Sequence, residues 1–152
     1  MTDTKKSEQQ KVDKAPKHVY KYESKPIAKS GRECLYTCQE IVAKTSRLYK
    51  YQIGTGLINT ASQLVYAIYD ALDYVGFNEN KVKKINIVLE CLRRLVIIIR
   101  VMKDLNQISQ DMFEKSILQL VSMKTQILNW LNFINEKIKE ASEKDKDETT
   151  NK

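Results

Sequence analysis

Glycine and proline are scarce over most of this chain, and this scarcity is the strongest constraint on how it folds. Between residues 27 and 141 the sequence contains four glycines and no proline. Tight turns depend on these two residue types, and proline interrupts helices, so this stretch has few places to turn but can form long helices. The composition therefore favours a helical fold over an all-β fold.

Apolar residues recur at three- and four-residue spacing through the same stretch, as expected for helices with one buried face. Gly76 is suited to end one helix, and Ser109 to begin another, with Asp111 in its first turn. The pattern predicts four helices, over about residues 28–49, 51–75, 79–105 and 110–141. Because the links between them are short, we expect an all-α fold, an antiparallel up-and-down four-helix bundle over residues 27–141.

The two ends of the chain lack this apolar period. Residues 1–26 are polar and rich in Lys, Gln and Ser, and the first 25 residues contain seven basic and four acidic side chains. Residues 142–152, SEKDKDETTNK, are also highly charged and contain no large apolar residue. The sequence therefore predicts a flexible basic N-terminal arm over residues 1–26 and a disordered C-terminal tail over residues 142–152.

The most apolar part of the chain is LECLRRLVIIIRVMKDL, residues 89–105. Its arginines interrupt the apolar run and exclude a membrane span. The β-branched residues 96–99 would suit a strand, but the helical period continues on both sides of them and favours a helix. At 100° per residue, its apolar side chains cover about 240° of the helix circumference. One bundle buries little more than ~100° of a surface helix, so this arc is wider than a single bundle needs.

A subunit interface would cover the surplus, because large exposed apolar patches usually mark partners. We expect a homo-oligomer, with the interface residues Ile87, Cys91, Ile97, Ile98 and Val101. The alternative is that the tails or the first helix cover the extra surface within one chain.

The net charge of +7 makes a polyanion a plausible partner. Residues 79–105 carry seven basic and three acidic side chains, so much of the surplus lies on the third predicted helix. The candidate nucleic-acid contacts are Arg47, Lys50, Lys81, Lys83, Lys84, Arg93, Arg94 and Arg100. The alternative is that these cations are solvated or paired along the helix, as Glu90 could pair with Arg93 and Arg94.

Residues suited to catalysis or metal binding are few. The single histidine, His18, lies in the predicted arm, and Cys34 and Cys38 are more typical of small buried side chains than of a metal site. Gly54-Thr55-Gly56 lacks the rest of a phosphate loop. We therefore expect no enzymatic activity, no metal site and no cofactor.

The cysteine content and the N-terminus bear on the compartment. Three cysteines form no disulfide framework, and the first residues contain no apolar stretch typical of a secretion signal. We expect a cytoplasmic protein with no membrane association.

Two short stretches resemble a known family. The residues Ile98 to Leu105, IIRVMKDL, followed by Ile108-Ser109, and the later stretch Ile127 to Leu131, ILNWL, are similar to the third and fourth helices of accessory variability determinant proteins. The resemblance spans about residues 30–138. The chain departs from the family pattern at Val96, where the family has an arginine, and at Leu128 and Asn129, where it has glycines. The related rRNA intervening-sequence four-helix-bundle proteins share the fold, but their signature at the second helix is not present.

This resemblance implies a function that composition alone does not. Accessory variability determinant proteins are basic four-helix bundles that assist the reverse transcriptases of diversity-generating retroelements. The resemblance implies a homopentameric ring that binds a reverse transcriptase and its template RNA, with DNA as a further candidate, in mutagenic cDNA synthesis. The alternative function is a structural bundle that binds proteins and has no role with nucleic acid.

Overall fold

Four long helices form the body of this protein in a computed structural model that describes residues 21–151. They are α2 (Pro26–Lys44), α4 (Thr55–Asp73), α5 (Glu79–Asp104) and α6 (Gln110–Thr150). A short helix, α3 (Arg47–Tyr49), and a π-helical segment, η2 (Lys50–Gly54), lead into α4. Residues 21–151 contain no strand, which confirms the predicted all-α class for this part of the chain.

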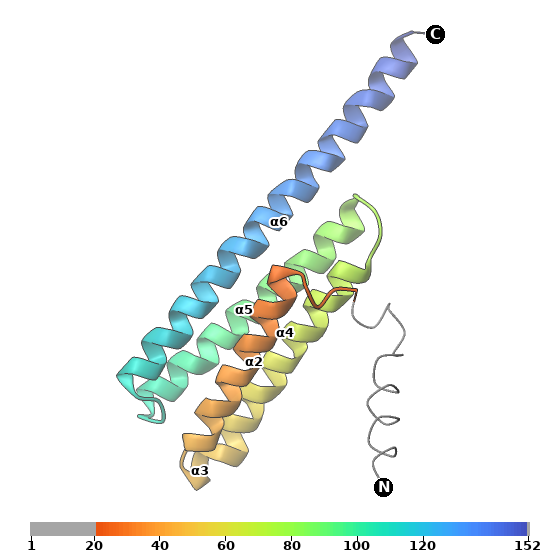
Figure 1. Ribbon diagram of the computed structural model, residues 1–152. Helices are drawn as coiled ribbons and strands as arrows, with labels where there is room; N and C mark the ends of the chain where they lie inside the picture. The colour runs from red at the N-terminus through yellow and green to blue at the C-terminus, as the bar shows by residue number, and fades with distance from the viewer. Residues whose placement is uncertain (1–20, 152) are drawn as a thin grey trace, which may run out of the picture.

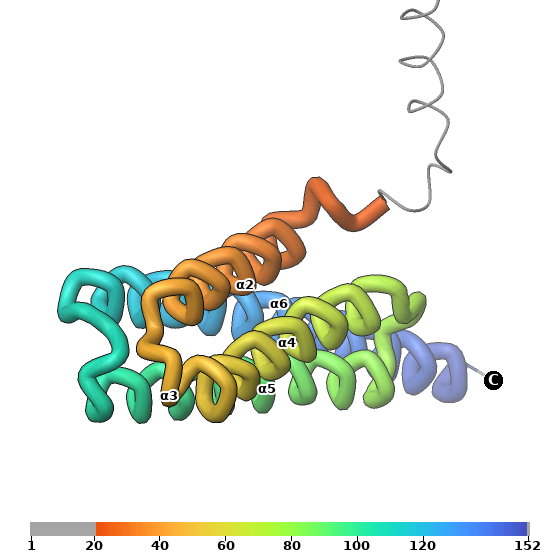
Figure 2. Tube along the Cα trace, turned by 90° about the horizontal axis from the view of Figure 1, so that it is seen from below, coloured from red at the N-terminus to blue at the C-terminus, as the bar shows by residue number. Residues whose placement is uncertain are grey.

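The helices alternate in direction and pack side by side (Figure 1). The main contacts join α2 to α4, α4 to α5, α5 to α6, and α6 back to α2. Figure 2 shows the same arrangement from another side, with α2 and α5 on opposite sides of the bundle. This is the up-and-down order expected from short connections between sequential helices.

The core lies between the four long helices. Its largest fully buried side chains come from all of them, and include Ile41 from α2, Leu64 from α4, Leu95 from α5 and Ile127 from α6. Gly31 allows α2 to approach α4 closely, because a Cβ atom at this position would lie 2.8 Å from Cδ1 of Ile68. Most of the buried side chains of the four helices follow the apolar period of the sequence.

The helix ends follow local chemistry. The side chain of Asn78 accepts hydrogen bonds from the backbone amides of Asn80 and Lys81 at the start of α5, and Ser109 accepts one from Met112 at the start of α6. Gly76, with φ of 127°, makes the turn between α4 and α5 in a conformation that other residues rarely adopt.

The first connection differs from the prediction. The first helix ends at Lys44 rather than near residue 49, because Thr45 and Ser46 are extended and Thr45 turns its hydroxyl back to the Ile41 carbonyl, 2.8 Å away. Leu48, which falls within the predicted first helix, therefore lies in α3 and is 68% exposed. The second helix was predicted from about residue 51. In the structure a continuous helical stretch begins at Arg47 with α3, passes through the π-helical segment and becomes the α-helix α4 at Thr55.

The C-terminal end also differs. The sequence predicted a disordered tail from residue 142, but α6 continues to Thr150 and projects beyond the other helices (Figure 1). These residues are exposed. The segment contains no glycine or proline, and its Lys and Glu residues favour helix and can pair at four-residue spacing, so local preference keeps it helical without packing.

Two further expectations concern the chain ends and membranes. Most of the predicted arm, including His18, lies outside the described residues. Among the described helices, none has a stretch long and apolar enough to cross a bilayer.

Candidate binding surfaces around α5

The solvent-facing side of α5 remains apolar in part, as the wide arc predicted. Ile87 is 53% exposed, Ile97 is 56% exposed and Val101 is 40% exposed. Over residues 21–151 the other helices leave these three side chains open to solvent, so the bundle does not cover the whole arc.

Two of the five predicted interface residues belong instead to the packing of one chain. Cys91 is 7% exposed and packs with the core, at the floor of a hollow between α4 and α5 that Ile87 also lines, so it offers little surface to another subunit. Ile98 is half-buried and packs against the same core. The exposed apolar part of the predicted interface therefore consists of Ile87, Ile97 and Val101.

Four of the predicted cations share the exposed side of α5, which we call the basic strip: Lys83, Arg93, Arg94 and Arg100. They lie within about 120° of the helix circumference and span about 25 Å along it. Among residues 21–151, only Arg94 of these four forms an ion pair, with Glu90 at 2.9 Å. Arg100 lies over the ring of Phe113, 5.8 Å from its centroid.

Lys81 does not belong to this strip, which contradicts its prediction as a nucleic-acid contact. Its side chain is buried, and its ammonium group donates hydrogen bonds to the backbone carbonyls of Ala71 and Tyr74, the latter at 2.7 Å. These carbonyls lie at the C-terminal end of α4, where no further helical turn can satisfy them. Burial lowers the pKa of the Lys81 amine because it disfavours the charged form.

The remaining three predicted cations lie at the two ends of the bundle. Lys84, in the first turns of α5, is half-buried and lies over the ring of Tyr74. Exposed Arg47 and half-buried Lys50 lie in the connection from α2 to α4. This connection meets the loop after α5, since the amide of Ser46 donates to the side chain of Gln107 at 3.0 Å. The structure thus brings together four of the eight predicted contacts and separates the others.

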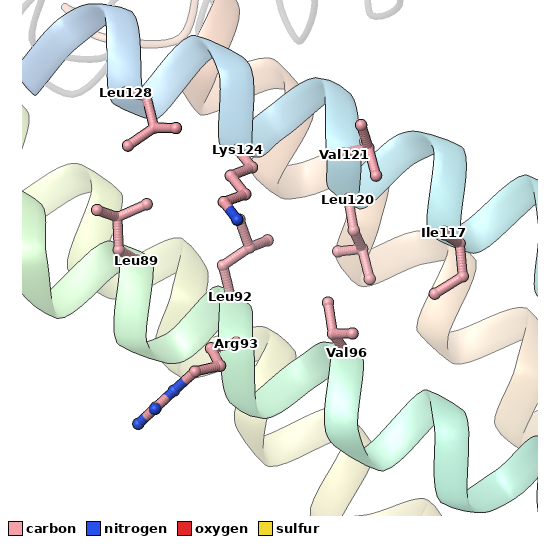
Figure 3. Close-up of a pocket in the computed structure, with 9 residues that line it drawn as sticks. All are labelled: Leu89, Leu92, Arg93, Val96, Ile117, Leu120, Val121, Lys124 and Leu128. Atoms are coloured by element: carbon pink, nitrogen blue, oxygen red, sulfur yellow. The ribbon is translucent and has the colours of Figure 1, made fainter.

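A groove of about 440 Å³ runs between α5 and α6 (Figure 3). Leu89 and Leu128 face one another across it, while Val96 faces Leu120 and Ile117. The nine residues that line it are Leu89, Leu92, Arg93, Val96, Ile117, Leu120, Val121, Lys124 and Leu128. Seven are apolar, two are basic and none is acidic.

Sequence reasoning missed this groove. The signal was present on α6, where Val121 and Leu128 fall beside the regular buried positions, and Val121 is 56% exposed. Only the pairing of α5 with α6 shows that these residues and the edge of the α5 arc form one surface.

The three described cysteines are buried, and their environments shift their pKa values in different directions. The hydrogen bond with Cys38 lowers the pKa of Cys34, although burial opposes this shift. Cys34, Cys38 and Cys91 are all reduced and buried. A hydrogen bond with Cys34 and burial raise the pKa of Cys38, and burial raises the pKa of Cys91. Thiols with a raised pKa are weak nucleophiles at neutral pH. Over residues 21–151, no three His, Cys, Asp or Glu side chains are grouped to hold a metal ion.

Known proteins give no independent guide to the role of these surfaces. The sequence matches no protein-family model and no curated protein.

Proposed function

We propose that this protein is a non-enzymatic, nucleic-acid-binding accessory protein that acts in the cytoplasm as a homo-oligomer. The observation that supports this proposal most directly is the basic strip of α5. Its cations are exposed and are held along one rigid helix, so they can meet successive phosphates without ordering a flexible loop.

The spacing along the strip suits a phosphate backbone. Arg93 and Arg100 are separated by seven residues, or about 10.5 Å along the helix, and Lys83 lies about 15 Å from Arg93 in the other direction. Contacts of this kind position a nucleic acid without reading its sequence. The proposed ligand is therefore a phosphate backbone, bound with marked dependence on salt.

The resemblance to accessory variability determinant proteins suggests the setting. In this proposal the protein partners a retroelement reverse transcriptase and its template RNA, and a ring of subunits repeats the basic strip. Repetition would raise the local positive potential and the avidity for a long polyanion. The exposed Ile87, Ile97 and Val101 are the proposed contacts between subunits. Ile97 and Val101 lie among Arg93, Arg94 and Arg100 on the same side of α5, so these contacts would place part of the basic strip along the seams of the ring.

Charge reversal tests the basic strip. The variant Arg93→Glu/Arg94→Glu should bind a fluorescein-labelled RNA at least about tenfold more weakly, measured by anisotropy, because fewer phosphates are neutralised and fewer counterions are released. The slope of log affinity against log salt should also fall by about 0.7 to 0.9 for each phosphate that the variant no longer neutralises.

The control is Lys144→Glu/Lys146→Glu, which makes the same change in net charge on the exposed end of α6. It should keep most of the affinity and the full salt slope. If RNA binding weakens equally in both double variants, the loss comes from net charge alone, and the assignment of the phosphate contacts to α5 is overturned. If the wild-type protein binds no RNA or DNA at about 0.15 M salt, the proposed nucleic-acid-binding function is excluded, and the alternative, a bundle that binds proteins, replaces it.

A further inference from the structure

The groove between α5 and α6 is a second candidate surface beside the basic strip. We propose that it binds an amphipathic helix of a partner protein, with an apolar face toward the groove and acidic residues along its flanks. This inference does not depend on nucleic-acid binding, because Arg93 is the only residue that the groove shares with the basic strip and the other eight lining residues lie outside the strip.

The dimensions of the groove suit a helix. Its lining residues extend from Leu89 to Val96 on α5 and from Ile117 to Leu128 on α6, or about 10.5 Å and 16.5 Å along the two axes. This length corresponds to two to three helical turns. An amphipathic helix presents apolar side chains at three- and four-residue spacing, and such a helix commonly lies in the groove between two others.

The charges of the groove indicate the chemistry of its occupant. Lys124 reaches from α6 toward α5, and the guanidinium group of Arg93 points outward at the opposite edge (Figure 3). No carboxylate lines the groove to balance them. A helix with acidic residues on its two flanks would meet Lys124 on one side and Arg93 on the other, while the apolar stem of Lys124 still packs on its surface.

The same charges argue against a second copy of this chain on the groove. A twofold interface places the same surface patch on both subunits. Two copies joined here would therefore bring the lysine and arginine of each groove into one interface without an acidic partner in either lining.

The experiment uses a synthetic helical peptide of about 16 residues, with leucines at three- and four-residue spacing and glutamates on both flanks. A matched peptide carries lysines in place of the glutamates. Fluorescence anisotropy with the full chain should show at least about tenfold tighter binding of the acidic peptide. Equal affinity for both peptides would show that the groove does not select a helix with acidic flanks.

Two pairs of matched variants locate the binding site. Val121→Gln, in the groove, should lower the affinity for the acidic peptide by at least about tenfold. Leu118→Gln, on the same helix but outside the lining, should leave this affinity unchanged. Lys124→Glu should reduce the preference for the acidic peptide, whereas Lys115→Glu should keep it.

Several outcomes would overturn the proposal. One is equal weakening by Val121→Gln and Leu118→Gln, and another is undiminished binding in Val121→Gln. A third is that Val121→Gln dissociates a wild-type oligomer, measured by light scattering, since a second copy would then occupy the groove. RNA binding by the Val121→Gln variant reports on the basic strip separately, so either proposal can fail while the other stands.

Discussion

At the scale of single residues, Lys81 shows how local sequence can mislead. It belongs to a run of residues rich in lysine, Lys81 to Lys84, which in sequence looks like one solvated basic patch. The structure buries its amine against the end of α4 and over the ring of Trp130, 5.4 Å from the centroid. Its neighbour Lys83 remains exposed. The helical period does separate the two, because Lys81 stands four residues before the buried Ile85 on the same face and Lys83 lies about 200° away around the helix. Only the packing of α4 and α6 shows which groups the Lys81 amine meets.

Replacing Lys81 tests this role. Lys81→Met should lower the free energy of unfolding by about 1 to 3 kcal/mol, because the variant lacks two hydrogen bonds from a charged donor and leaves two helix-end carbonyls without their partner. Urea denaturation followed by circular dichroism measures the change. The control is Lys83→Met, which should stay within about 0.5 kcal/mol of the wild type. Similar stability of all three proteins would show that the ammonium group does not cap α4.

The lowered pKa of Lys81 also predicts a dependence on pH. The folded-state pKa lies below the unfolded value near 10.5, because the protonated amine carries the cost of a buried charge in the native state. As the pH rises toward 10.5, the native state loses the proton first and gains stability relative to the unfolded state. The stability difference between wild type and Lys81→Met should therefore grow with pH over this interval. A difference that stays constant or shrinks would contradict the shift.

At the scale of the elements, the helices themselves were predictable and their ends less so. The predicted bounds of the third helix, about 79–105, agree closely with α5, because Asn78 provides a strong N-cap and the apolar period is long. The junction near residue 45 was missed, since Thr45 and Ser46 form a break without glycine or proline. The extension of α6 to Thr150 was missed because the charged residues 142–150 lack an apolar period. Such a segment can still continue a helix that is already nucleated.

Truncation tests whether the projecting end of α6 supports the bundle. A chain that ends at Ser142 should lack the helical circular dichroism signal of residues 143–150 and keep the unfolding free energy within about 0.5 kcal/mol, because this end of α6 is exposed. Chemical denaturation of the two chains provides the comparison. A decrease well above about 1 kcal/mol would instead indicate that this end packs against another part of the protein or another copy.

At the scale of the whole molecule, the surplus apolar surface of α5 leads to a prediction about assembly. The purified chain should be oligomeric by light scattering, and Ile97→Glu should shift it toward the monomer, because the variant replaces one of the three exposed apolar side chains of the proposed contact with a charge. Leu118→Glu, at a position that is also exposed but lies on α6, should leave the assembly unchanged. A monomeric wild-type protein at high concentration would exclude the interface, and with it the proposed ring.

The sequence alone determined which faces of the helices are apolar, that the chain would form long helices, and that α5 has more apolar surface than one bundle can bury. These properties follow from the spacing of residues along one helix, which the chain carries locally. The tertiary structure decided which side of that surplus meets a neighbouring helix, that the Lys81 amine meets the carbonyl groups at the end of α4, and that residues of α5 and α6 form a groove with basic edges. Those features depend on how two helices lie against each other, and helical spacing within either one does not specify that contact.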